Sequence, residues 1–376
     1  MTPLALFGAR VFDGSVIHDN AAVLIAGDTV VDIVSNDAVP ADAQRRDLGG
    51  GLLAPGFIDL QVNGGGGVML NDGPGVERMA VIVQAHRRFG TTGLLPTLIT
   101  DTDAVTEAAI AAAEEAVKSV PGVLGLHLEG PHLAPARKGA HLASLMRPLA
   151  DADVDILIRA RERIGVLMVT VAVEQAPPAM IRRLANAGVI VSIGHTDAPY
   201  DLTMRAIDAG ARSATHLFNA MSQIGNRDPG VVGAVIASPT VAAGIIPDGH
   251  HVHPQNLRMA MASKRGRGKL YLVTDAMASI GMEGDSFLLN GRTVRRSCGR
   301  LTLEDGTLAG ADIDMSAAVR YMVANVDVEL EEALRMASLY PAQVIGDARR
   351  GRIAAGSVAE LVHLDKDLNV SEVIVP

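Results

Sequence analysis

The sequence predicts an α/β protein that contains a TIM-like (β/α)₈ barrel and a small β-sandwich domain formed by both ends of the chain. Eight short apolar runs alternate with helical segments after residue 50, which is the order of repeated strand and helix units. Both ends instead contain short β-type runs joined by Gly, Asp and Asn turns. We therefore expect residues 1–50 and 346–376 to form the small domain and residues 51–345 to form the barrel.

The predicted barrel strands are short apolar stretches that end in turn residues or in polar side chains. They cover residues 52–62, 93–99, 123–129, 166–173, 189–195, 213–216, 241–246 and 269–275. Helical segments lie between them, for example residues 75–89, 103–117, 178–187 and 198–209. Several of these begin at Asp or Pro and end at Gly, as the chemistry of helix caps favours.

The composition limits the classes of function. A chain of 376 residues with 48% hydrophobic residues buries a large core, and a net charge of −9 argues against general affinity for nucleic acid or anionic membranes. The single cysteine, Cys298, excludes an internal disulfide. We find no signal-peptide pattern and no apolar run of the ~20 residues that a membrane span needs. We therefore expect a cytoplasmic protein without a nucleic-acid or membrane partner.

Four polar residues end predicted strands, at the edge of the barrel where such folds carry their chemistry. They are Glu129, His195, His216 and Asp275. Two imidazoles and one carboxylate are the ligand set of a catalytic zinc-type metal, whose fourth position holds water. Asp275 is then free to act on that water. The alternative is a buried polar network without a metal.

The first predicted barrel strand places Asp59, Gln61 and Asn63 on one face. Many metal-dependent hydrolase barrels have a His-x-His pair there. Amides are poor metal ligands, so the pattern predicts one metal ion instead of two. In the alternative interpretation, Gln61 and Asn63 satisfy backbone groups at a Gly-rich loop.

The stretch GLHLEGPHLAPARKGAH places His127 and Glu129 on the same strand face, so we expect His127 to be a polar partner of Glu129. Two later loops carry Arg227 and His251, either of which can bind a phosphate through charge-assisted hydrogen bonds. A solvated loop residue is the alternative for each.

The order of several motifs along the chain resembles that of the N-acetylglucosamine-6-phosphate deacetylase family of the amidohydrolase superfamily. The motifs are PGFIDLQVNGGGG, LPTLIT, GLHLEGPHLAPARKGAH, VSIGHT, ATHLFNAM, NRDPG, DGHHVH, LVTDAMA, DGTLAG and LYPAQVIG. The resemblance extends to about residue 362. His132 after EGP departs from the family pattern, as do Ala311 and Asp312 in GADIDM.

The resemblance implies a homodimeric enzyme of amino-sugar catabolism that hydrolyses N-acetyl-D-glucosamine 6-phosphate to D-glucosamine 6-phosphate and acetate. It implies one divalent metal ion per subunit, Zn²⁺ first and otherwise Fe²⁺, Co²⁺ or Mn²⁺, held by Glu129, His195 and His216. Asp275 is implied as the general acid and base, and His141 as the group that polarises the acetyl carbonyl. The implied substrate contacts, with the phosphate site completed by the neighbouring subunit, are Ala140, His141, Asn219, Ala220, Arg227, His251, Leu308, Ala309 and Gly310.

Three other functions remain open from the residues. The enzyme can act on another N-acetylhexosamine phosphate, such as N-acetylgalactosamine 6-phosphate. A cyclic amide hydrolase usually needs the His-x-His pair and a bridging lysine, for which this chain has Gln61, Asn63 and Glu129. A non-catalytic sugar-phosphate sensor would be expected to have lost Asp275 or a metal ligand, and the chain retains all of them.

Overall fold

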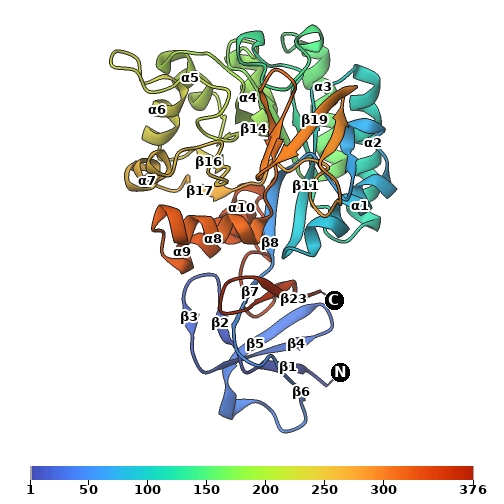
Figure 1. The fold of residues 1–376 in the computed structure, drawn as a ribbon, viewed down its shortest axis with the longest axis vertical. Coiled ribbons are helices and arrows are strands. Elements are labelled where there is room, and N and C mark those ends of the chain that lie inside the picture. Colours follow the sequence, from blue (N-terminus) through green and yellow to red (C-terminus); the bar gives the residue numbers. More distant parts are fainter. Residues whose placement is uncertain (1, 376) are drawn as a thin grey trace. The chain divides into compact units, whose positions relative to one another are not determined.

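The computed structural model describes residues 2–375, and its largest sheet is the predicted barrel (Figure 1). Eight parallel strands follow one another in the order of the sequence. They are β8 (Phe57–Val62), β11 (Thr91–Ile99), β12 (Leu126–Glu129), β13 (Leu167–Val171), β14 (Ile190–Ile193), β15 (Ser213–Ala214), β16 (Ala242–Ile245) and β17 (Leu270–Leu272). Each predicted apolar run supplies one of these strands, so the barrel prediction is confirmed. The first run is divided, because its start, β7 (Leu52–Pro55), joins a different sheet.

The last strand returns to the first and nearly closes the barrel. A parallel bridge pairs Val62 with Ala276. The backbone N–H of Asp275 donates to the carbonyl of Gln61 at 3.0 Å, and the N–H of Asn63 donates to the carbonyl of Ala276 at 2.9 Å. The closure therefore brings the polar residues of the first strand beside Asp275.

Helices follow the barrel strands, as a (β/α)₈ fold requires. They are α1 (Val76–Arg87), α2 (Asp103–Ser119), α3 (Asp151–Ile164), α4 (Pro178–Asn186), α5 (Tyr200–Asp208), α6 (Gly230–Ala237) and α7 (Pro254–Ser263), followed by α8 (Met315–Val326), α9 (Leu330–Ala337) and α10 (Leu339–Ile345). Short 3₁₀ turns cover Asn36–Ala38, Leu70–Asp72, Pro135–Arg137 and Ala143–Leu145. The Thr102 side chain caps α2 by accepting the N–H of Val105. None of the described helices is both long and apolar enough to cross a membrane.

The small β-domain consists of two sheets built from both ends of the chain (Figure 1). One sheet has the order β5-β4-β1-β6 and the other β23-β22-β7-β2-β3. The strands are β1 (Leu4–Phe7), β2 (Arg10–Phe12), β3 (Ile17–His18), β4 (Ala21–Ala26), β5 (Thr29–Ser35), β6 (Gln44–Asp47), β22 (Leu361–Leu364) and β23 (Val370–Ile374). Leu6 and Val23 of one sheet and Leu53 and Leu361 of the other share a buried apolar cluster. This packing confirms the predicted β-sandwich.

The described residues divide into two compact units. One unit comprises Leu60–Ala85 and Leu94–Ile313, and it contains most of the barrel. The other contains the small β-domain together with α8, α9 and α10.

A four-stranded antiparallel sheet, which the sequence analysis did not predict, is inserted after the last barrel strand. Its strands are β18 (Ser286–Leu289), β19 (Arg292–Ser297), β20 (Arg300–Thr302) and β21 (Leu308–Ala311). Asn290 and Gly291 link the first two strands with positive φ values of 49° and 74°. Arg292 donates a hydrogen bond to the carbonyl of Ala140, in the loop that leads to His141. The inserted sheet is thereby tied to a loop of the barrel.

A row of buried hydrogen bonds crosses the barrel interior. His127 Nδ1 lies 3.0 Å from the carbonyl oxygen of Leu60, and His127 Nε2 lies 2.7 Å from Thr170 Oγ1. Thr215 Oγ1 lies 2.7 Å from both Thr170 Oγ1 and Ser192 Oγ. The hydrogen bonds of His127 therefore go to this row and not to Glu129, so the expectation for His127 was wrong. The alternation of side chains along a strand predicts correctly that His127 faces inward. Its hydrogen-bond partners depend on its position along the strand, two residues before Glu129.

A smaller antiparallel pair, β9 (Gly64–Gly65) with β10 (Val68–Met69), forms the Gly-rich loop after the first barrel strand. The loop returns so that the N–H of Leu70 donates to the carbonyl of Asn63 at 2.9 Å. The backbone of Asn63 is thus held on both sides.

Candidate active site

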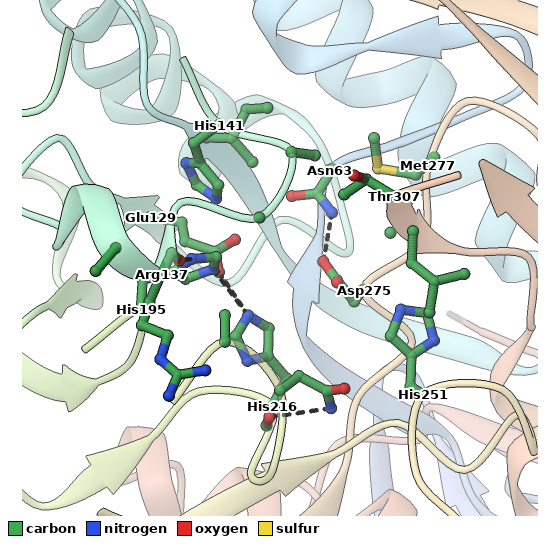
Figure 2. A pocket seen from close by; sticks show the side chains of 18 residues that line it. Asn63, Glu129, Arg137, His141, His195, His216, His251, Asp275, Met277 and Thr307 are labelled. Atoms are coloured by element: carbon green, nitrogen blue, oxygen red, sulfur yellow. Dashed lines mark hydrogen bonds and ion pairs between the residues drawn. The ribbon is translucent and has the colours of Figure 1, made fainter. Parts of the chain in front are cut away.

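A cavity of about 390 Å³ lies where the barrel strands end (Figure 2). Its walls come from strand ends, from the loop after β12 and from the inserted sheet. The lining residues are Asn63, Ile99, Glu129, Ala136, Arg137, Gly139, Ala140, His141, His195, His216, Asn219, Ala220, His251, Asp275, Met277, Thr307, Leu308 and Gly310. All of them belong to the unit that contains most of the barrel.

Glu129, His195 and His216 converge on one point of this cavity. The Nε2 atoms of His195 and His216 lie 3.1 Å and 3.0 Å from Glu129 Oε1, and 3.1 Å from each other. Burial by itself raises the pKa of Glu129, but the adjacent His195 and His216 outweigh it and hold the pKa well below its usual value. The carboxylate is therefore ionised.

The orientation of His195 tests whether these groups fit a metal ion. Nδ1 of His195 lies 2.7 Å from the carbonyl oxygen of Arg137, to which it can only donate. The lone pair on Nε2 then faces the oxygen of Glu129, and two acceptors at 3.1 Å repel each other unless a proton or a cation lies between them. An imidazole held in this way by a backbone carbonyl is typical of metal-binding histidines. The donor set fits a divalent cation of the zinc type.

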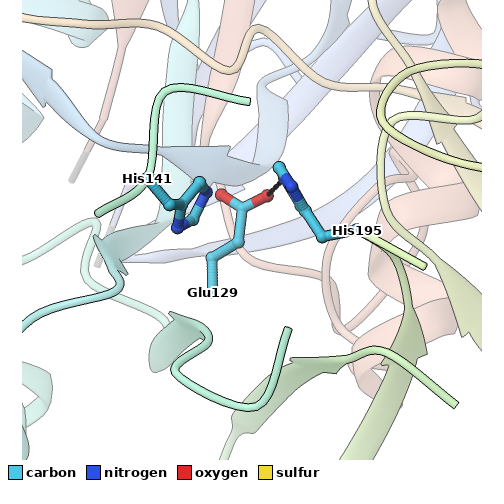
Figure 3. A group of neighbouring side chains, drawn as sticks. All are labelled: Glu129, His141 and His195. Atoms are coloured by element: carbon cyan, nitrogen blue, oxygen red, sulfur yellow. Dashed lines mark hydrogen bonds and ion pairs between the residues drawn. The ribbon is translucent and has the colours of Figure 1, made fainter. Parts of the chain in front are cut away.

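A second group of candidate ligands, Glu129, His141 and His195, has ligand atoms within 4.8 Å of one another (Figure 3). The backbone N–H of Thr100, which can only donate, bonds to Nδ1 of His141 at 3.2 Å, and the Thr100 hydroxyl lies 2.9 Å from the same nitrogen. A neutral ring whose Nδ1 accepts a hydrogen bond carries its proton on Nε2 and has no lone pair left for a metal. Burial, aided by the nearby His195, lowers the pKa of His141 to about 3, so the ring is neutral. His141 therefore presents an N–H to the cavity and suits a donor role.

Asp275 is held by two amide side chains. Asn63 Nδ2 donates to Asp275 Oδ1 at 2.6 Å, and Gln61 Nε2 donates to the same oxygen at 3.1 Å. Gln61 Nε2 also lies 3.2 Å from Glu129 Oε2. The amides thus bond to the two carboxylates of the site, and the interpretation that they merely satisfy backbone groups was wrong.

Burial, together with the charge of Glu129, raises the pKa of Asp275 to about 6. A carboxyl group with such a pKa exchanges protons readily near neutral pH. Asp275 can therefore accept a proton and return it within one reaction cycle.

The structure brings most of the predicted substrate contacts to the cavity and leaves two outside its lining. Those that line it are Ala140, His141, Asn219, Ala220, His251, Leu308 and Gly310. Ala309 is fully buried in an apolar cluster with Met277. Arg227 is exposed on the loop that follows His216.

Sequence reasoning missed several lining residues, above all Arg137 and Gly139. Arg137 forms an ion pair with Asp197 at 2.7 Å, and its carbonyl orients His195. Gly139 has φ +53°, and a Cβ atom there would come within 3.3 Å of the His195 ring. Both lie in the loop between Glu129 and His141, and this position between two predicted site residues was the available signal.

Comparison with known proteins places the chain in a family. Residues 52–375 match the Amidohydrolase family, and residues 4–53 match the NagA composite domain. The chain is 40% identical to an N-acetylgalactosamine-6-phosphate deacetylase of Shewanella sp. (strain ANA-3), over 96% of this chain and 92% of that protein. It is 38% identical to an N-acetylglucosamine-6-phosphate deacetylase of Haemophilus influenzae, over 90% and 89% of the two chains.

The fold agrees with this relationship. The crystal structure of N-acetylglucosamine-6-phosphate deacetylase from Pasteurella multocida superimposes with a TM-score of 0.95 at 37% identity, over 99% of this chain and 98% of that one. The chain is therefore an enzyme of the amidohydrolase family and belongs, within that family, to the N-acetylglucosamine-6-phosphate deacetylases and their N-acetylgalactosamine-6-phosphate relatives.

Proposed function

We propose that this enzyme hydrolyses N-acetyl-D-glucosamine 6-phosphate to D-glucosamine 6-phosphate and acetate. One observation carries the proposal: a buried ligand set of Glu129, His195 and His216 shares its cavity with Asp275 and with the N–H of His141. The relatives named above, which act on N-acetylhexosamine 6-phosphates, support the choice of substrate.

Glu129, His195 and His216 would hold one divalent metal ion, with Zn²⁺ as the first candidate and Fe²⁺, Co²⁺ or Mn²⁺ as alternatives. When bound, such an ion supplies Lewis-acid chemistry to water and to the acetyl oxygen. The side-chain nitrogens of Gln61 and Asn63 face carboxylates, so these two residues supply no ligands for a second ion. We therefore expect one metal ion per subunit.

The protein's own groups handle the protons. Asp275 accepts a proton from the attacking water and passes it to the leaving nitrogen, and its pKa of about 6 suits both steps. The N–H of His141 donates to the acetyl oxygen as negative charge develops there. A donor of this kind typically contributes about 3–4 kcal/mol to the stability of the transition state.

Arg227 and His251 are proposed to bind the phosphate, with Arg227 reaching the cavity of the neighbouring subunit in a homodimer. The exposure of Arg227 and its absence from the lining of its own cavity support this arrangement. Nδ1 of His251 bonds to Asp248 at 2.6 Å, which positions its ring at the cavity wall. Ala140, Asn219, Ala220, Leu308 and Gly310, which line the cavity, are proposed to contact the sugar.

N-acetyl-D-galactosamine 6-phosphate is the second candidate substrate, because the relative at 40% identity is named for it. The unusual residues of GADIDM do not decide between the epimers. Ala311 is buried outside the cavity lining, and Asp312, with a 5% exposed side chain, bonds to Arg296 at 2.6 Å.

Acetate release tests the function. Purified enzyme with a defined metal ion is assayed on both epimeric 6-phosphates and on unphosphorylated N-acetyl-D-glucosamine, with Asp275→Asn as the matched inactive control. We expect the highest kcat/KM for N-acetyl-D-glucosamine 6-phosphate. A higher value for the galacto epimer would favour the second candidate, and no release from either phosphate would refute both.

A further inference from the structure

The side-chain amide of Asn63 has only one orientation that suits its neighbours. Asn63 follows the first barrel strand, is 1% exposed and has its backbone N–H and carbonyl engaged with Ala276 and Leu70. Its Nδ2 donates to Asp275 Oδ1 at 2.6 Å. A carboxylate oxygen accepts hydrogen bonds, so the amide nitrogen must face Asp275 and the amide oxygen must face away from it.

The oxygen of this amide is a buried acceptor that lacks a hydrogen-bond partner among the described residues. Asn63 nevertheless lines the cavity, and Figure 2 shows its oxygen turned from Asp275 toward the side where His141 lies. Buried acceptors are almost always satisfied in native proteins. A group aimed at a ligand cavity obtains its partner from the ligand.

We propose that Asn63 Oδ1 accepts a hydrogen bond from the N–H of the scissile amide, an inference that rests on the proposed function. Asp275 gives its proton to this same nitrogen, and Asn63 is its bonded neighbour. Holding the N–H fixes the rotation of the acetamide, so that the nitrogen lone pair which forms after attack on the carbonyl carbon faces Asp275. The nitrogen then gains the proton, the C–N bond breaks, and the amine and acetate leave.

Two other donors compete for this acceptor: the attacking water and the sugar hydroxyls. All three are present with the amide substrate, but an ester analogue, 2-O-acetyl-D-glucose 6-phosphate, has an oxygen in place of the N–H. Removal of the Asn63 oxygen therefore affects the two substrates differently if its donor is the amide. A difference that instead arises through Asp275, which must protonate the leaving amine more than a leaving alcohol, appears in Gln61→Ala as well.

The experiment measures kcat and KM for the amide and the ester, corrected for spontaneous hydrolysis, with wild type, Asn63→Ala and Gln61→Ala. Gln61→Ala is the matched control, because it also removes a donor to Asp275 Oδ1, while Gln61 does not line the cavity. We expect Asn63→Ala to lose about 10-fold more kcat/KM on the amide than on the ester. Gln61→Ala should show a much smaller difference between the two substrates, and a difference as large as that of Asn63→Ala would assign the effect to Asp275 and overturn the inference.

Equal losses of Asn63→Ala on both substrates would overturn the inference, because the donor would then be a group that amide and ester share. Asn63→Ser replaces Asn63→Ala if the latter does not fold, as judged by circular dichroism and metal content. Failure of wild type to hydrolyse the amide is a separate outcome, which would refute the proposed function itself.

Discussion

His141 and His195 are neighbouring imidazoles, with ring centres 4.4 Å apart, whose Nδ1 atoms have opposite hydrogen-bonding roles. In His195, Nδ1 donates to a backbone carbonyl, which leaves a lone pair on Nε2. In His141, Nδ1 accepts the backbone N–H of Thr100, which leaves a proton on Nε2. Two side chains of one type thus present a lone pair and an N–H, respectively, to the cavity, and backbone groups set the difference.

Metal content measured by elemental analysis tests this distinction. We expect one equivalent of metal per chain in the wild type, and loss of stoichiometric metal in His195→Ala and His216→Ala. His141→Ala should keep the full equivalent but lose about 10²–10³-fold in kcat, because it removes only a donor to the developing charge. Loss of metal in His141→Ala would instead identify His141 as a ligand.

Asp275→Asn should keep both the metal and the fold but lose about 10²–10⁴-fold in kcat. An amide can neither take the proton of the water nor pass one to the leaving nitrogen. The measurement is acetate release by metal-replete enzyme, with thermal unfolding as the control for the fold. A loss of less than 10-fold would assign the proton transfer to another group.

At the scale of elements, the loop after β12 contains a buried imidazole outside the active site. The side chain of His132 is 3% exposed, its Nδ1 bonds to the carbonyl of Arg147 at 3.2 Å, and its Nε2 lies 4.0 Å from Asp153. Burial lowers the pKa of His132 and outweighs the opposing effect of the Asp153 carboxylate. The ring therefore stays neutral in the folded chain at pH values where the unfolded chain already takes up a proton.

This difference gives a pH dependence of stability with a definite sign. The folded pKa lies below the unfolded value of about 6.5, so the contribution of His132 is complete above that pH and is lost as the pH falls through the folded pKa. Gln cannot take up the proton. The Tm of His132→Gln should therefore fall less between pH 7 and pH 5 than the Tm of the wild type.

Thermal unfolding across this range is the measurement, and the exposed His250→Gln is a control for the removal of one imidazole. Parallel curves for His132→Gln and wild type would contradict the prediction.

The eight barrel strands were predictable because their apolar runs are continuous and are separated by helical segments of sufficient length. The inserted sheet was missed although its turns carry a signal: Asn290–Gly291 is a favoured pair for a hairpin with two positive φ values. Its strands alternate exposed and buried positions around charged residues such as Arg295 and Arg296, so they lack the apolar character of barrel strands. A search for apolar runs alone passes over such hairpins.

At the scale of the whole molecule, the convergence of Glu129, His195 and His216 was predictable from strand ends, whereas the amide contacts and the tautomers were not. Glu129 ends one strand, and His195 and His216 each lie two residues beyond the end of another strand of the same sheet, so the topology brings them together. The bonds of Asn63 to Asp275 and of Thr100 to His141 depend on the register of barrel closure and on loop paths, which local sequence patterns do not encode.

The proposed homodimer predicts complementation between two impaired variants. Arg227→Ala should lower kcat/KM for the 6-phosphate substrate by about 10–100-fold, because a charge-assisted contact is lost, and should barely change the turnover of the unphosphorylated sugar. Asp275→Asn should be nearly inactive on the phosphorylated and on the unphosphorylated sugar. In a mixed dimer, the cavity of the Arg227→Ala subunit receives the intact Arg227 of its Asp275→Asn partner.

Activity on the phosphorylated substrate should therefore rise when the two purified variants are mixed, dissociated and reassembled, above the sum of their separate activities. Sedimentation measures the dimer itself. If the mixture shows only the sum while the dimer is intact, Arg227 serves its own subunit or has no part in phosphate binding.

The donor and the acceptor of every hydrogen bond in the row that crosses the barrel interior are fixed by the carbonyl at one end of the row. The carbonyl of Leu60 can only accept from His127 Nδ1, so His127 Nε2 accepts from Thr170, Thr170 from Thr215, and Thr215 from Ser192. An additional proton would have to charge the imidazole, whose pKa burial lowers to about 4. At neutral pH the imidazole therefore stays neutral, and the row is a chain of aligned O–H and N–H dipoles that keeps a single polarity across the barrel interior.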